Sequence, residues 1–287
     1  MSALVALQHC RAAVLVGDQA QLPATVLSTV ARDCRYDRSL FARLAHCGVR
    51  PLMLTTQFRM HTDICTFPSA LFYSGRLRSA PAVAALPPEA YYAVQPLHPF
   101  AFFDVADGKE AYESGSSSAH NTAEAELAVA LYVRLARVLA DAEGGGVTVP
   151  ALLARRGFGA RVGFVTPYRG QVEELKRAVQ RRLGDAALAE LTAHRSIKTV
   201  DAWQGGERDV IIVSLVRTRP GALGFVDDVQ RMNVALTRAR RALWVLGSRV
   251  ALGRSQHWGR LIAHAAAKER VVRQPLGASV PVPATLD

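Results

Sequence analysis

Short apolar runs separated by helix-like segments dominate the second half of the chain. These runs are continuous rather than alternating, which is typical of strands buried on both faces of a sheet. The expected strands are residues 160–166, 197–200, 209–216 and 242–247, and the helices between them are 171–183 and 233–240. Strand–helix–strand repetition of this kind predicts an α/β fold with a parallel sheet flanked by helices.

The first third of the chain also contains short apolar runs, but fewer of them. The apolar run 12–16 ends at Gly17–Asp18, and residues 51–56 form a second short apolar run. Both are expected to be strands, the first of them buried and parallel, with a helix around residues 40–44 between them.

The segment between these two regions is mostly irregular in pattern. Residues 78–121 are rich in Ala, Pro, Tyr and Ser, which favours a surface loop or lid. Asn121 or Thr122 can then cap a long helix, because an apolar stripe at helical spacing follows. The stripe consists of Leu127, Leu131, Leu135, Val138 and Leu139.

The charge balance favours a polyanionic partner. Lys and Arg number 35 and Asp and Glu 24, so the formal net charge is +11. This indicates nucleic acid first and acidic membrane surfaces second, although an Arg-rich composition without functional meaning stays open as an alternative.

Cysteine usage and apolar run length narrow the class of protein further. The four cysteines form no C-x-x-C pair and no zinc-ligand spacing, so we expect reduced thiols in an intracellular protein with no metal site of its own. No secretory signal is present, and the longest apolar run is far too short to span a bilayer. The sequence does not decide between cytoplasm and nucleus.

Polar side chains near the first predicted strand are the first candidates for binding chemistry. Asp18 and Gln21 follow that run, and ligands of open α/β sheets bind at the carboxyl ends of strands. Arg59 offers a guanidinium suited to phosphate, and Phe58 a flat face for a base. Each of these signals alone is also compatible with an ordinary turn or a surface residue.

Three later stretches carry further candidates. Thr166, Tyr168 and Gln171 lie where a strand passes into a helix, a natural place for contacts to a phosphodiester backbone. The stretch 198–218 is dense in polar groups and contains a Gly-Gly turn. The Arg-rich stretch 231–241 can neutralise several phosphates, or it can be a solvated basic face.

The order of these stretches resembles one family. The blocks VLVGDQAQLPATVLS, SLFARL, QFRMHTDICTFPSALFYSGRL, VGFVTPYRGQ, KTVDAWQGGERDVIIVS and QRMNVALTRARRALWVLGS occur in this order over roughly residues 5–250. Together they resemble the superfamily 1 helicases of the nonsense-mediated-decay and senataxin type. The resemblance implies a RecA-like second helicase domain, ATP with Mg²⁺ as cofactor, and single-stranded RNA or DNA as partner.

The resemblance also implies a role for individual residues. Asn121 and Glu124 match an N-x-x-E feature of the family without an assigned role. The implied catalytic residues are Gln21 and Glu207 near the γ-phosphate and Arg59 and Arg238 as arginine fingers; the nucleotide-binding residues are Asp18, Gln57, Phe58, Gln204 and Gly205; and the nucleic-acid-binding residues are Thr166, Tyr168, Gln171, Thr199 and Asp201.

One part of the family pattern is absent from this sequence. No G-x-x-x-x-G-K-[ST] phosphate-binding loop occurs, since Gly108-Lys109 is followed by Glu110, and the acidic magnesium-binding motif is missing too. We therefore expect residues 1–55 to be the last part of a first RecA-like domain, 56–250 a second RecA-like domain, and 251–287 a partly disordered tail.

Two functions fit this reading. The first is an ATP-dependent helicase or translocase, present as a portion that is inactive alone because a first RecA-like domain must supply the Mg²⁺ ligands. The alternative is a catalytically inactive module that binds single-stranded nucleic acid.

Overall fold

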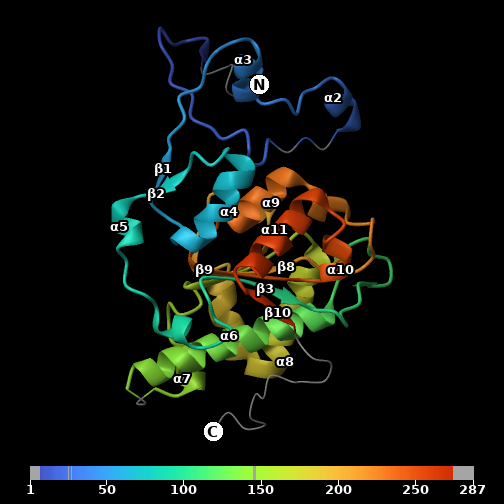
Figure 1. Cartoon of the computed structure of the whole chain (residues 1–287). Helices are drawn as coiled ribbons and strands as arrows, with labels where there is room; N and C mark the ends of the chain where they lie inside the picture. The colour runs from blue at the N-terminus through green and yellow to red at the C-terminus, as the bar shows by residue number, and fades with distance from the viewer. Residues whose placement is uncertain (1–6, 25, 27, 145–146, 274–287) are drawn as a thin grey trace.

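A six-stranded, fully parallel sheet forms the centre of the molecule (Figure 1). The computed structural model describes residues 7–24, 26, 28–144 and 147–273. In spatial order the strands are β10 (Val271–Arg273), β3 (Phe100–Asp104), β9 (Ala239–Gly247), β8 (Arg208–Ser214), β6 (Val162–Thr166) and β7 (Ile197–Thr199). The predicted α/β class with a parallel sheet is confirmed.

Helices cover both faces of this sheet. In Figure 1, α6 (Thr122–Ala142), α7 (Val149–Ala154) and α8 (Arg169–Ala193) lie below it, whereas α4 (Thr62–Phe72), α9 (Val229–Leu236) and α11 (Gln256–Ala267) lie above. The shorter elements are α2 (Thr29–Asp33), α3 (Leu40–His46), α5 (Pro81–Ala84), α10 (Arg249–Leu252), η1 (Ala90–Ala93), η2 (Asp201–Trp203), η3 (Gly224–Asp227), and the strand pairs β1 (Thr56–Gln57) with β2 (Arg78–Ser79) and β4 (Ala111–Tyr112) with β5 (Ala119–His120).

Strand β8 shows why the apolar runs form this architecture. Its Val210 and Ile212 belong to the core on the α6–α8 side, while Ile211 and Val213 belong to the core under α4, α9 and α11. All four are at most 2% exposed. Successive side chains of a strand point to opposite faces, so a strand covered on both faces needs an unbroken apolar run.

Two regions are more ordered than the sequence suggested. The stretch 78–121, expected to be a loop or lid, contains β3, whose five residues are all buried between β10 and β9. The predicted tail 251–287 contains α11 and β10, which pack on β3, so its part up to Arg273 is folded. Residues 274–287 lie outside the described part of the chain.

The two strands predicted in the first third are wrong. The run 12–16 has no strand, and its Val14 and Val16 are each 90% exposed. The run 51–56 is also without strand up to the start of β1, and its Leu52 is 91% exposed. The helix predicted around residues 40–44 is confirmed as α3, with the Ser39 side chain capping it.

Candidate functional site

Arg59 lies in the short loop between β1 and α4, and Gln57 shapes that loop. The Gln57 Oε1 accepts hydrogen bonds from the backbone N–H groups of Arg59 (2.8 Å) and Met60 (2.7 Å). Its Nε2 donates to the Met60 carbonyl (2.7 Å) and to Ser79 Oγ (2.8 Å). With every polar atom of its amide engaged, Gln57 fixes the backbone from which the Arg59 side chain starts.

The Arg59 guanidinium is held by two groups from distant parts of the chain. Its Nε forms an ion pair with Glu207, and its Nη1 donates to the Thr237 carbonyl at 3.0 Å. The other Glu207 oxygen accepts from Arg240 at 3.1 Å. The hydrogen bond from Arg240, together with Arg59, lowers the pKa of Glu207, so this carboxylate stays charged between two cations.

Arg238 is a buried arginine at the point where α9 passes into β9. Its side chain is part of a residue only 2% exposed and donates to the Val234 carbonyl (2.9 Å), Thr237 Oγ1 (2.9 Å) and the Gly206 carbonyl (3.4 Å). Among the residues that the structure describes, no carboxylate forms an ion pair with it. A buried charge that is hydrogen-bonded but not neutralised is costly, which makes this position unusual.

The electrostatic surroundings of Arg238 fit an anion site. Burial, followed by the nearby charge of Arg59, lowers the pKa of Arg238 to about 10, so it keeps its proton at neutral pH. Its Nη2 lies 3.4 Å from the Gln21 Oε1. Two guanidiniums and a neutral amide thus converge from three segments that are far apart in the sequence.

Hydrogen bonds join the segment that carries Gln21 to the later part of the chain, which contains the sheet. Asp18 Oδ2 accepts from Gln21 Nε2 (2.8 Å) and from the Tyr73 hydroxyl (2.7 Å). Asn233 Nδ2 donates to the Ala20 carbonyl (2.9 Å) and to the Tyr73 hydroxyl (2.8 Å). Burial raises the pKa of Tyr73 to about 12, so its proton remains available for Asp18.

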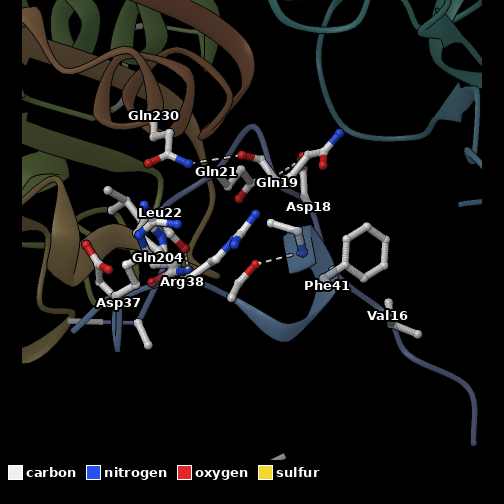
Figure 2. Close-up of a pocket in the computed structure, with 16 residues that line it drawn as sticks. Val16, Asp18, Gln19, Gln21, Leu22, Asp37, Arg38, Phe41, Gln204 and Gln230 are labelled. Atoms are coloured by element: carbon white, nitrogen blue, oxygen red, sulfur yellow. Dashed lines mark hydrogen bonds between the residues drawn. The ribbon is translucent and has the colours of Figure 1, made fainter. Parts of the chain in front are cut away.

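An open cleft of about 750 Å³ lies beside this segment (Figure 2). Two glutamines of the body reach across to it: Gln204 donates to the Leu22 carbonyl (3.3 Å) and Gln230 to the Gln19 carbonyl (3.0 Å). Its lining residues on the N-terminal side include Asp18, Gln21, Arg38 and Phe41. The cleft is therefore lined by polar side chains where Gln204 and Gln230 lie, and by both polar and apolar side chains on the N-terminal side.

Phe58 and Gly205 are the chain neighbours of Arg59 and Gln204. Phe58 is 74% exposed, so its ring is free to receive a flat ligand. Gly205 has a φ of 78°, a conformation that favours glycine and that brings the backbone close to whatever lies above it.

The five residues predicted to contact nucleic acid gather at the carboxyl ends of β6 and β7, but they differ in exposure. Thr166 and Gln171 are fully buried and Tyr168 is 8% exposed, whereas Thr199 is half-buried and Asp201 is exposed. The side chains of Thr199 and Asp201 are therefore more accessible to a bound strand than the buried side chains of the other three residues. The assignment of all five stays a prediction.

The Arg-rich stretch 231–241 is not a free basic face. Arg238 is buried, and Arg231, Arg240 and Arg241 all form ion pairs. The partners are Asp201 and Asp228 for Arg231, Glu207 and Asp209 for Arg240, and Glu89 for Arg241. Acidic residues from elsewhere in the sequence thus pair with Arg231, Arg240 and Arg241, and the expectation that this stretch offers cations to phosphates stays a prediction.

A second buried polar cluster lies near the start of α6. Asn121 caps α6, and Glu124 accepts hydrogen bonds from Asn121 Nδ2 (3.3 Å), Ser214 Oγ (2.7 Å) and the Val216 backbone N–H (2.9 Å). Gln171 donates to the Asn121 carbonyl (3.0 Å) and to Ser214 Oγ (2.9 Å). Burial raises the pKa of Glu124 to about 7. This cluster gives the N-x-x-E feature a structural role: it holds the end of β8.

Sequence reasoning missed three residues of the site. Tyr73 and Asn233 anchor the Gln21 segment, and Arg240 shares Glu207 with Arg59. Asn233 and Arg240 lie inside a stretch already singled out, so their positions were visible. Their partners were not, because each contact joins segments more than 30 residues apart.

The described residues hold no group of three or more His, Cys, Asp or Glu that could bind a metal ion. None of the described helices is both long and apolar enough to cross a membrane.

Comparison with known proteins shows what the chain is similar to. A family model described as an AAA domain matches residues 36–250. Helicase SEN1 of Saccharomyces cerevisiae is 34% identical over 254 residues, which are 88% of this chain and 11% of that protein. The probable helicase MAGATAMA 3 of Arabidopsis thaliana is 35% identical over 272 residues, 93% of this chain and 31% of that protein.

The human probable helicase senataxin is 30% identical over 281 residues, 93% of this chain and 10% of that protein. The chain thus spans between about a tenth and a third of the length of these relatives.

Proposed function

The chain belongs to the AAA-domain family of superfamily 1 helicases, and on that premise we propose that it is the phosphate-sensing portion of an ATP-dependent helicase or translocase. The observation that carries the proposal is Arg238, a buried guanidinium with no carboxylate partner, which faces Gln21 and lies close to Arg59. A terminal phosphate would supply the missing negative charge.

The roles follow from the chemistry of phosphoryl transfer. Such reactions need positioning and stabilisation of charge on the transferred group more than covalent help. Arg238 and Arg59 would stabilise that charge, while Gln21 would orient the attacking water or a phosphate oxygen. Glu207 would position Arg59 through their ion pair.

The remaining nucleotide contacts would come from the rim of the same region. Asp18 holds Gln21 and Gln57 holds the Arg59 loop, so both act by positioning. The exposed ring of Phe58 would stack on the base. Gln204, which lines the cleft in Figure 2, and its neighbour Gly205 would approach the sugar and phosphates.

Other parts of the ATP site would come from outside this sequence. The 287 residues contain no phosphate-binding loop, and the described residues offer no set of Mg²⁺ ligands. We assign both to a first RecA-like domain. The exposed Val14, Val16 and Leu52 support this, since apolar runs with such exposure have the composition of strands without their neighbours.

The substrate belongs to the same proposal. Single-stranded RNA or DNA would lie across the carboxyl ends of β6 and β7, where Thr199 and Asp201 are accessible and Thr166, Tyr168 and Gln171 shape the surface from below. The net charge of +11 supports a polyanionic partner. The setting would be intracellular, in cytoplasm or nucleus.

Hydrolysis assays on two proteins test the proposal: the chain itself, and the chain joined to the phosphate-loop domain of a relative such as SEN1. We expect no nucleic-acid-stimulated ATPase from the chain alone and clear turnover from the fusion. In the fusion, Arg238→Ala should lower turnover by about 10³- to 10⁵-fold, the range known for arginine fingers.

Arg241→Ala is the matched control, because Arg241 lies three residues after Arg238, in β9, and is paired with Glu89. Its turnover should stay near that of the unchanged fusion. Turnover by the chain alone would contradict the division between two domains, and a fusion indifferent to Arg238→Ala would contradict the sensing role. An inactive fusion that still binds single strands would favour the binding-module alternative.

A further inference from the structure

A groove between α8 and β7 gathers positive charge away from the site described above. It has a volume of about 340 Å³. Four cationic residues line it, Arg169, Lys176, Arg195 and Lys198, together with a single acidic residue, Glu173.

Most of this charge is not neutralised within the chain. Among the described residues, Arg169, Arg195 and Lys198 form no ion pair, and only Lys176 has a partner, Glu173, at 2.9 Å. This differs from the stretch 231–241, where every exposed arginine has an acidic partner. Burial lowers the pKa of Lys198, and the like charges of Arg208 and Arg195 lower it further.

The Lys198 side chain is held by an aromatic ring that is not part of the groove lining. The Lys198 ammonium lies 4.1 Å from the centre of the Trp203 ring. That ring is fully buried, and its Nε1 donates to the Phe164 carbonyl at 3.0 Å. A cation–π contact of this kind holds the ammonium in place without cancelling its charge. Strand β7 is an edge strand of the sheet, so one side of its backbone also has no neighbouring strand.

The spacing of the cations selects the type of ligand. Arg169 and Lys176 are seven residues apart on α8, which is about 10 Å along a helix. A ligand with consecutive phosphates can contact both without either side chain bending toward the other. Thr199, at the carboxyl end of β7, lines the same groove and connects it to the predicted nucleic-acid surface.

We propose that this groove binds the phosphodiester backbone of the single strand through Arg169, Lys176, Arg195 and Lys198. The proposal rests on the proposed function and adds to it a path along the α8–β7 edge. The contacts are to phosphate, so they are independent of base sequence.

Fluorescence anisotropy with a labelled single-stranded oligonucleotide of mixed sequence tests this on the full chain. The test variant is Arg195→Gln with Lys198→Gln. The matched control is Arg254→Gln with Arg260→Gln, two exposed cations near the opposite edge of the sheet that form no ion pair with any described residue. Both variants lose two charges, so they differ in place and not in net charge.

We expect the test variant to bind at least about tenfold more weakly at low salt, and the slope of log affinity against log salt to become shallower by about 1.4, the value for two lost contacts to a single strand. The control should bind as the unchanged chain does. Arg195→Lys with Lys198→Arg, which keeps both charges, should retain the affinity. Melting curves should show that all variants are folded at the temperature of the assay.

If the test variant and the control lose affinity for the oligonucleotide equally, the groove is not the binding site and net charge alone explains the loss. Binding by the unchanged chain with no loss in the test variant would also overturn the groove while leaving the proposed function intact. No binding by the unchanged chain, or binding to anionic vesicles in place of the oligonucleotide, would overturn both.

Discussion

Short apolar runs occur both before and after residue 56, but they are exposed in the first region and buried in the second. The run 12–16 and the strand β8 are both short and apolar, yet Val14 is 90% exposed whereas Ile211 is fully buried. Helices α2 and α3 have no buried residue, while α6 has twelve. An apolar run becomes a strand only when neighbouring strands are available to pair with it. The described part of the chain supplies them for β8 and not for residues 12–16.

The largest expected effect comes from placing the same charge in both regions. Ile211→Asp puts an unpaired carboxylate between β8 and the α9 layer and should cost more than about 4 kcal/mol, enough to prevent folding. Val14→Asp should change the free energy of unfolding by less than about 0.5 kcal/mol. Urea unfolding followed by circular dichroism measures both. A large loss from Val14→Asp would show that residue 14 is buried in solution.

An effect of intermediate size is expected from Glu124, whose protonation should make the free energy of unfolding depend on pH. The unfolded Glu124 carboxyl titrates near its ordinary value of 4.5, and burial raises the folded pKa to about 7. The unfolded chain therefore loses this proton first, so the contribution of Glu124 to stability is greatest below pH 4.5 and decreases as the pH rises to 7. The full decrease is about 3 kcal/mol, with no further change above pH 7.

Glu124→Gln removes this titration while keeping the shape of the side chain. The difference in unfolding free energy between the two proteins should therefore change between pH 4.5 and 7 and be constant above 7. Urea titrations at several pH values give that difference. A difference that does not vary with pH would mean that Glu124 is ionised throughout.

The smallest expected effect concerns the connection between the two regions. Asn233→Ala removes the hydrogen bonds to the Ala20 carbonyl and the Tyr73 hydroxyl. It should loosen residues 16–24 by about 1–2 kcal/mol, the range for two hydrogen bonds of this kind. Hydrogen exchange of backbone amides in that segment should speed up while exchange in β8 stays unchanged. Equal acceleration in both would show that Asn233 stabilises the body instead.

The same contrast explains how much of the fold could be read from the sequence. Strands β6 to β9 and helices α6 and α8 were predictable because their runs or stripes match a burial pattern that the structure satisfies. Strand β3 was missed because FAFFD lies in a region rich in Ala and Pro, where composition favoured a loop. Helix α11 carries an apolar stripe at helical spacing, Trp258, Leu261, Ile262 and Ala265, which could have revealed it.

The candidate site was predictable in some of its members, and its contacts were not predictable. The order of motifs pointed to Arg59, Glu207 and Arg238. It could not show that Glu207 is shared between Arg59 and Arg240, or that Arg231 and Arg241 have acidic partners. Ion pairs between distant segments depend on the folded geometry, and neither charge count nor spacing encodes it.

The ion pair between Arg59 and Glu207 has a consequence for selectivity. Arg59 already has a carboxylate partner, so an incoming anion must compete with Glu207 rather than fill an empty place. A neutral or weakly charged group would lose that competition, whereas a group with two negative charges can win it. Under the proposed function, Glu207 therefore acts as an internal competitor that sets the minimum charge to which the arginine responds, and it would help the protein to distinguish a terminal phosphate from less charged ligands.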